Sequence, residues 1–216
     1  ALVTGRLSLR GDPLVDVLGV LTICVYGSWF YGFGVLIDDI GAELGMGATA
    51  LGASFGAAQA LVGLLALVTG RLLDRRGPSI VLGVIGPLGA VALGVSGRVG
   101  DSLLFAVLFA IGGGLTGAAG FYTLTQSVIV RADRTRSLER IIRLTIWGAL
   151  ASPIAIPVTE LLRSTLGWRL AIEIPAGFAF IAFLASSRVV RLPYGSPAEE
   201  RGRWGAVIAG AVRDAV

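Results

Sequence analysis

The sequence predicts an all-α integral membrane protein with six transmembrane helices, and three observations support this class. Hydrophobic residues make up 55% of the 216 residues and charged residues only 15%, whereas a soluble domain carries about 25% charge. The mean hydropathy is +0.83. Apolar runs of about 20 residues recur along the chain, and such a run crosses a hydrocarbon core of about 30 Å as a helix. Strands are not expected, because the alternating pattern of a membrane barrel is missing from the sequence.

Six apolar segments follow one another, and each is predicted to be one membrane-spanning helix. In chain order they are 14–37, 48–67, 80–95, 103–130, 144–162 and 170–187. Residues 14–187 are therefore predicted to form one six-helix bundle. We expect residues 1–13 and 188–216 to lie in the cytoplasm, with the chain truncated before a seventh helix.

The Arg residues predict the orientation of the bundle. All 18 basic residues are Arg. Fifteen lie before the first segment, after the second, between the fourth and fifth, or after the sixth; only Arg98, Arg163 and Arg169 lie in the other connections. Because Arg-rich loops stay on the cytoplasmic side, both chain ends are expected in the cytoplasm. The protein itself is expected in the cell membrane (the inner or plasma membrane). Arg residues that flank apolar runs also account for the pI near 10 without a nucleic-acid partner.

The polar composition argues against an enzyme. The chain has no His and a single Cys, Cys24, so neither a disulfide nor a Cys and His metal cluster is expected. The Gly-x-Ser-x-Gly pattern occurs once, as GASFG (52–56), but inside a segment predicted to be a membrane helix and not at the strand-to-helix turn of a nucleophile elbow. We therefore expect no cofactor, no metal and no catalytic residue.

A weak internal repeat relates the two halves of the bundle. The segments VTGRLLDRRG (68–77) and VTELLRSTLG (158–167) share four residues at an offset of 90. Each closes the second helix of a three-helix set, and because three is odd, the two sets would be inverted across the membrane. Inverted three-plus-three repeats are found within the six-helix halves of one class of transporters.

The segment GRLLDRRGPSIVL (70–82) resembles the signature loop between helices two and three of the major facilitator superfamily. Gly70, Asp74, Arg75 and Gly77 match that signature residue by residue. We expect Asp74 just beyond the end of a helix and close enough to Arg75 and Arg76 to pair, with Gly70 allowing close packing and Gly77 a tight turn. The resemblance implies a gate that holds the cytoplasmic side shut. The alternative is an Arg-rich loop that only fixes orientation.

Two further segments resemble the monocarboxylate-transporter-like branch of that superfamily. They are FGVLIDDIGAELGMGATALGASFG (33–56) and PVTELLRSTLGWR (157–169). The resemblance implies the N-terminal half of a twelve-helix secondary transporter that carries a small organic solute by alternating access, with the C-terminal six-helix half as its partner. Two alternatives remain: a multidrug or metabolite exporter of another branch, and a membrane scaffold without transport activity.

In this superfamily helices one, two, four and five line the solute cavity, which selects the polar residues of those segments as candidates. The substrate-binding candidates are Tyr26, Trp29, Gln59, Tyr122, Gln126 and Arg143. For each candidate the alternative is ordinary helix packing, or for Arg143 anchoring at the membrane surface. Close helix contacts are expected at two sets of glycines: Gly52 and Gly56 in the second segment, and Gly113, Gly117 and Gly120 in the fourth.

Overall fold

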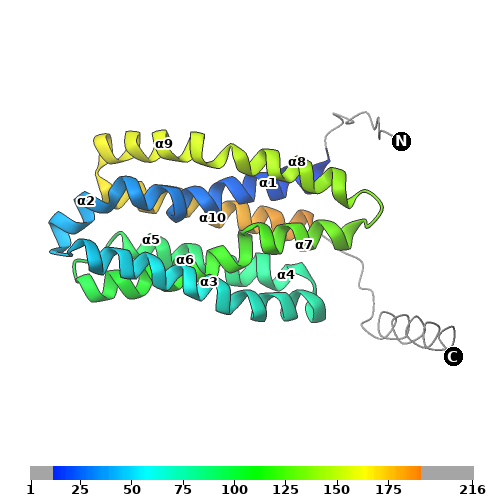
Figure 1. The fold of residues 1–216 in the computed structure, drawn as a ribbon, viewed down its shortest axis with the longest axis horizontal. Coiled ribbons are helices and arrows are strands. Elements are labelled where there is room, and N and C mark those ends of the chain that lie inside the picture. Colours follow the sequence, from blue (N-terminus) through cyan, green and yellow to red (C-terminus); the bar gives the residue numbers. More distant parts are fainter. Residues whose placement is uncertain (1–11, 191–216) are drawn as a thin grey trace, which may run out of the picture.

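The computed structural model describes residues 12–190, which fold into a bundle of six long helices (Figure 1). Each of the six is long and apolar enough to cross a membrane. The chain is therefore an all-α, multi-pass membrane protein, as predicted.

Four of the six spans are built from more than one helical element. Span 1 joins α1 (Pro13–Val25), the π-helix η1 (Tyr26–Tyr31) and α2 (Gly32–Leu44), and span 2 is α3 (Ala48–Arg76). Span 3 joins α4 (Pro78–Ile80), the π-helix η2 (Val81–Ile85) and α5 (Gly86–Ser96). Span 4 joins α6 (Ser102–Gly120) and α7 (Tyr122–Ala132), span 5 joins α8 (Ser137–Ala149) and α9 (Ala151–Leu166), and span 6 is α10 (Trp168–Val189).

The predicted segments were too short at the charged ends. Span 1 continues to Leu44, span 2 to Arg76, and span 5 already begins at Ser137. Arg188, predicted as the first residue after the bundle, is still part of α10. Hydropathy marks only the part of a helix that lies in hydrocarbon, and a helix whose charged turns reach water continues beyond it.

Glycines with positive φ end three of the spans. Gly45 ends span 1, Gly77 (φ 75°) ends span 2 and Gly167 (φ 84°) ends span 5. The N–H of Gly77 donates to the carbonyl of Leu73 at 3.1 Å, and the N–H of Gly167 donates to that of Arg163 at 3.0 Å. In both places the next span begins with the following residue, so the two turns share one geometry at an offset of 90 residues.

Span 4 lies in the core, while spans 2 and 5 lie at the edge. In the most apolar part of span 4, 61% of the residues are buried, against 17% in span 2 and 22% in span 5. One end of the bundle, which we call the motif end, contains the turn after α3 and the α7–α8 connection (Figure 1). The N-terminal end of α1 and the C-terminal end of α10 lie there too. The other connections lie at the opposite end.

The close helix contacts predicted for span 4 are present. A Cβ added at Gly113 would touch Trp29, and Cβ atoms at Gly117 and Gly120 would collide with Val62 and Val25. Residues 12–190 make no such contact at Gly52 and Gly56 of α3, where an added Cβ meets no described atom within 4 Å. Both glycines lie on a helix face that residues 12–190 leave uncovered.

Candidate functional site

Two irregular points in the helices meet at the centre of the bundle. Span 4 is broken at Phe121, whose extended backbone (φ −72°, ψ 168°) separates α6 from α7. Span 1 widens into the π-helix η1 at Tyr26–Tyr31. The ring of Phe121 stacks on Tyr26, with centroids 4.0 Å apart and planes 12° apart. Irregular backbone at membrane depth is found where protein or a cavity satisfies it, and it is typical of binding sites in transporters.

Tyr122 belongs to this aromatic junction and ties it to span 5. Its ring lies 5.6 Å from that of Tyr26, centroid to centroid. Its hydroxyl donates to the carbonyl of Thr145 at 3.4 Å, and the ring lies where a Cβ on Gly148 would stand. The junction therefore joins three spans through the two tyrosine side chains.

Trp29 is also part of the junction, but as a core residue. Its side chain is 1% exposed and stacks on Phe121 at 5.6 Å. Gly113 and Gly117 pack against the indole ring from span 4. Among the described residues the indole N–H has no hydrogen-bond acceptor. A buried donor without a partner costs about 1–3 kcal/mol, so this N–H is an uncompensated group within the junction.

At the motif end, Asp74 pairs with a residue that the sequence did not suggest. Asp74 was expected beyond the helix and next to Arg75 and Arg76, but it lies inside the last turn of α3. Its carboxylate accepts a hydrogen bond from the guanidinium of Arg131 and forms an ion pair with it. Arg131 lies in the last turn of α7. The pair joins spans 2 and 4. The expectation failed because α3 continues through Arg76, which leaves Asp74 in a helical turn.

The two glycines of the signature have different surroundings. Gly77 makes the tight turn predicted for it, with φ 75°, at the join between α3 and α4. Residues 12–190 make no close packing at Gly70, because a Cβ there meets no described atom within 4 Å. Arg75 occupies the last turn of α3 between Asp74 and Gly77.

One face of α3 carries a stripe of small and polar residues. Successive members are three, four or seven residues apart, so they lie one above the other on the helix. The members are Gly52, Gly56, Gln59, Gly63, Gly70 and Asp74. The four glycines of this α3 stripe have no described atom within 4 Å of an added Cβ, and Gln59 is exposed. Gln59 therefore lies on an open face of α3.

Gln126 lines a polar groove between α7 and α8 at the motif end. The groove has a volume of about 410 Å³. Its polar wall consists of Thr123, Gln126, Ser127, Arg131 and Arg134. The same Arg131 that pairs with Asp74 thus also borders a hollow with hydroxyl and amide groups. The positive charge of this groove suits an anion.

Arg143 is held between spans 5 and 1. Its Nη2 donates to Oδ1 of Asp16 at 2.9 Å, and the indole N–H of Trp147 donates to the same oxygen at 3.3 Å. The side chain of Arg143 is 26% exposed and that of Asp16 is 33% exposed, so the pair is mostly buried. This contact fits the anchoring interpretation of Arg143 better than that of a residue open to a solute.

A second set of ion pairs closes the opposite end. It uses the three Arg residues predicted for that side: Arg98 with Glu173 at 2.8 Å, Arg163 with Asp39 at 3.0 Å and Arg169 with Glu43 at 2.8 Å. Arg169 also donates to the carbonyls of Gly97 and Val99. These contacts link spans 1, 3, 5 and 6 at the opposite end.

Sequence reasoning found three members of the aromatic junction and missed its centre. Phe121 was overlooked because a Phe in an apolar run predicts continued helix. The glycine-rich segment before it, FAIGGGLTGAAG (109–120), was the available signal of close packing. Within residues 12–190 no group of three or more His, Cys, Asp or Glu residues is placed to hold a metal ion.

No protein-family model matches the sequence, and a search of curated proteins finds no match. The function therefore has to be inferred from the geometry of this chain.

Proposed function

We propose that the chain is one six-helix half of a secondary transporter of the major facilitator type, in the monocarboxylate-transporter-like branch. It would carry a small organic solute across the cell membrane by alternating access, with a second six-helix bundle as its partner. Both ends of the chain would lie in the cytoplasm, as the Arg distribution predicts.

The α3 stripe is the observation that carries this proposal. An amide such as that of Gln59 is costly to expose to hydrocarbon, and glycines allow another helix to approach closely. A face that combines four uncovered glycines with Gln59 is thus suited to another protein surface rather than lipid. A second bundle packed on this face would enclose the solute between the two halves.

The aromatic junction is the proposed floor of the solute site. Tyr26 and Tyr122 are both partly exposed, and both lie where span 4 is broken and span 1 is widened. Their hydroxyls offer donors to a carboxylate or carbonyl. The Arg-bearing groove lined by Gln126 would draw an anionic solute toward the bundle from the motif end.

The Asp74–Arg131 pair is the proposed gate. It joins spans 2 and 4 at the end that we expect in the cytoplasm, and both side chains are about half exposed. Charged groups at the water boundary can exchange partners at small cost. Asp74 also ends the α3 stripe, so the second bundle would reach it directly.

An inverted repeat is supported by more than the turns at Gly77 and Gly167. Thr69 of span 2 and Thr159 of span 5, again 90 residues apart, are both 2% exposed. The hydroxyl of Thr69 donates to Ala118 of span 4, and Thr159 lies against Gly32 of span 1. The second helix of each set thus packs on the first helix of the other, as a two-fold relation requires.

Uptake into proteoliposomes tests the proposal. The 216-residue chain is compared with a protein that also carries the reading frame downstream of Val216, using labelled lactate, pyruvate and a panel of neutral and cationic solutes. Saturable uptake is expected only for the longer protein. Saturable uptake by the 216-residue chain alone would indicate that a second copy of the chain takes the place of the second bundle. If neither protein takes up any solute, the scaffold alternative is favoured.

A further inference from the structure

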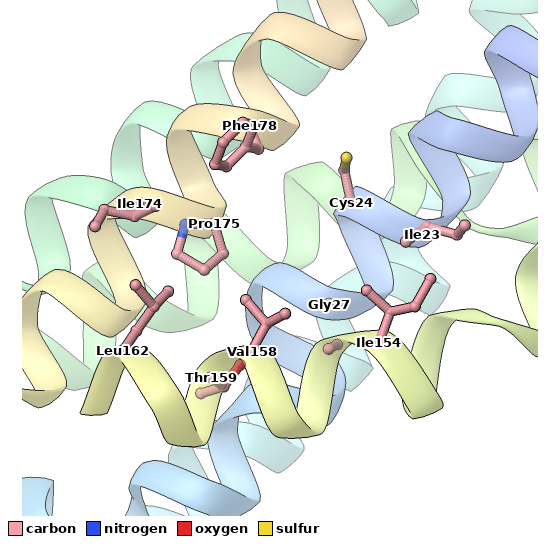
Figure 2. A pocket seen from close by; sticks show the side chains of 11 residues that line it. Ile23, Cys24, Gly27, Ile154, Val158, Thr159, Leu162, Ile174, Pro175 and Phe178 are labelled. Carbon is pink, nitrogen blue, oxygen red and sulfur yellow. The ribbon is translucent and has the colours of Figure 1, made fainter. Parts of the chain in front are cut away.

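An apolar cavity lies between spans 1, 5 and 6, apart from the aromatic junction. Its volume is about 150 Å³. Cys24 and Gly27 of span 1, Val158 and Leu162 of α9, and Pro175 and Phe178 of α10 line it (Figure 2). Its residues in spans 1 and 6 come from the middle of those spans, whereas Val158 and Leu162 come from the C-terminal part of span 5. The cavity therefore lies at membrane depth, on the side of the bundle away from the motif end.

Water is not a suitable occupant of this cavity. A buried water needs two to four polar partners, and an apolar cavity of about 150 Å³ stays dry while accepting a molecule such as benzene. Thr159 supplies the single hydroxyl among the lining residues and Cys24 a weakly polar thiol; the remaining walls are hydrocarbon. The same chemistry excludes the polar solute proposed for the transporter site.

The cavity opens toward the outside of the bundle. Two residues of its wall, Val158 and Phe178, are 44% and 61% exposed, and they stand on neighbouring helices, α9 and α10. What surrounds a membrane protein at this depth is lipid tail. An empty hollow would forfeit dispersion contacts along its whole lining, and a tail that enters it restores them.

We propose that this cavity is a lipid site that holds the end of one acyl chain of a membrane phospholipid. Shape rather than hydrophobicity selects the tail, because lipid and apolar side chains are equally apolar. The tail would touch Gly27, which belongs to the π-helix η1. It therefore packs behind the turn of span 1 that carries Tyr26, and it fills the gap between that turn and spans 5 and 6.

Photo-crosslinking tests the site directly. The 216-residue chain is placed in bilayers that contain a phospholipid with a diazirine near the end of one tail, and the labelled residues are mapped by mass spectrometry. Phe178 and Ile181 form a matched pair on α10, since they are 61% and 63% exposed but only Phe178 lines the cavity. A several-fold excess of label at Phe178, and label on Cys24, are expected. Equal labelling of Phe178 and Ile181 would overturn the proposal.

A filling substitution gives the second test. Val158→Phe should remove the excess label, whereas Leu161→Phe, on the same helix and outside the cavity, should leave it unchanged. Cys24→Leu fills the cavity from the opposite wall and keeps the experiment decisive if Val158→Phe does not fold. Excess label that survives both filling substitutions would show that the tail lies elsewhere. None of these outcomes depends on transport activity.

Discussion

The carboxylate of Asp74 and the guanidinium of Arg131 join the ends of α3 and α7 at the motif end. Asp74 is 55% exposed and Arg131 is 43% exposed. Water and salt screen such a pair, which contributes only about 0–1 kcal/mol to stability. The bundle therefore does not depend on this contact for its fold, and the pair can separate at small cost, as the proposed gate requires.

The first prediction concerns this pair in the proposed two-bundle transporter. Asp74→Asn should lower solute uptake strongly while moving the free energy of unfolding by no more than about 1 kcal/mol, because an exposed pair is weak. Uptake in proteoliposomes and unfolding in detergent measure the two effects. Glu139→Gln, an exposed carboxylate at the same end, is the matched control and should change neither.

Exchanging the two charges separates the pair from the individual groups. The double variant Asp74→Arg with Arg131→Asp should recover part of the uptake lost by Asp74→Asn, because the contact between spans 2 and 4 is restored with reversed polarity. If Asp74→Asn takes up solute at the wild-type rate, the gate proposal is wrong, and the Arg-rich segment 70–82 only fixes the orientation of the bundle.

The sequence was sufficient to predict six apolar helices, because hydropathy is a local property of each segment. The six spans and the tight turn at Gly77 follow from local physics: burial of apolar length, and the freedom of glycine at positive φ. The contacts that define the candidate site are long-range. Nothing near Asp74 in the sequence points to Arg131, and nothing near Phe121 predicts that a broken turn will stack on Tyr26.

Gly70 shows a second limit of sequence reasoning. A glycine in a signature motif predicts close packing, but packing needs a partner, and the described residues 12–190 supply none at that position. By contrast, the glycines of span 4 pack closely because spans 1 and 2 of the same bundle cover them. Composition alone does not distinguish these two situations.

The second prediction concerns the contact between Tyr122 and Gly148. The Tyr122 ring occupies the space of a Cβ on residue 148, so Gly148→Ala should destabilise the bundle by about 1–3 kcal/mol through overpacking. Tyr122→Phe removes the hydroxyl that reaches closest and should recover part of this loss in the double variant. Thermal unfolding in detergent measures both effects. An added Cβ at Gly177 meets no described atom within 4 Å, so Gly177→Ala should not destabilise the fold.

The third prediction concerns orientation. In a Cys24→Ser background, single cysteines at Ser79 and Ser137 should react with an impermeant maleimide only from the cytoplasm, and cysteines at Gly100 and Gly47 only from outside. The Arg distribution requires this arrangement, because Arg-rich connections are retained on the cytoplasmic side. Labelling of residue 137 from outside would show that the bundle has the opposite orientation or that the six-span topology is wrong.

The fourth prediction concerns Asp133, in the connection between spans 4 and 5. The hydrogen bond from the Thr135 hydroxyl, followed by bonds from the N–H groups of Thr135 and Arg136, holds the pKa of this carboxyl below its usual range. A pKa lowered by folding stabilises the connection above the unfolded value of about 3.9, and this contribution is lost as the pH falls through the lower folded value. Carboxyl NMR titration of Asp133 should show a midpoint that Thr135→Ala raises and Ser137→Ala leaves in place.

The last prediction concerns the α3 stripe and distinguishes a protein partner from lipid. In the 216-residue chain, Gly63→Ala should be neutral or should raise the free energy of unfolding by up to about 1 kcal/mol, because alanine favours helix and nothing described lies within 4 Å of its Cβ. If the proposed second bundle packs on this face, a larger side chain there would hold it away. Gly63→Leu should therefore lower uptake and weaken the association of the two halves when they are expressed separately.

Gly177→Leu is the matched control for this substitution, because Gly177 is also an exposed helical glycine without a described neighbour, but on span 6. It should leave uptake and association at wild-type levels. If Gly63→Leu behaves like Gly177→Leu, the α3 stripe faces lipid, and Gln59 must then find its hydrogen bonds within the same chain. Loss of association with Gly63→Leu alone would instead place the second bundle on the face that carries Gln59, Gly70 and Asp74.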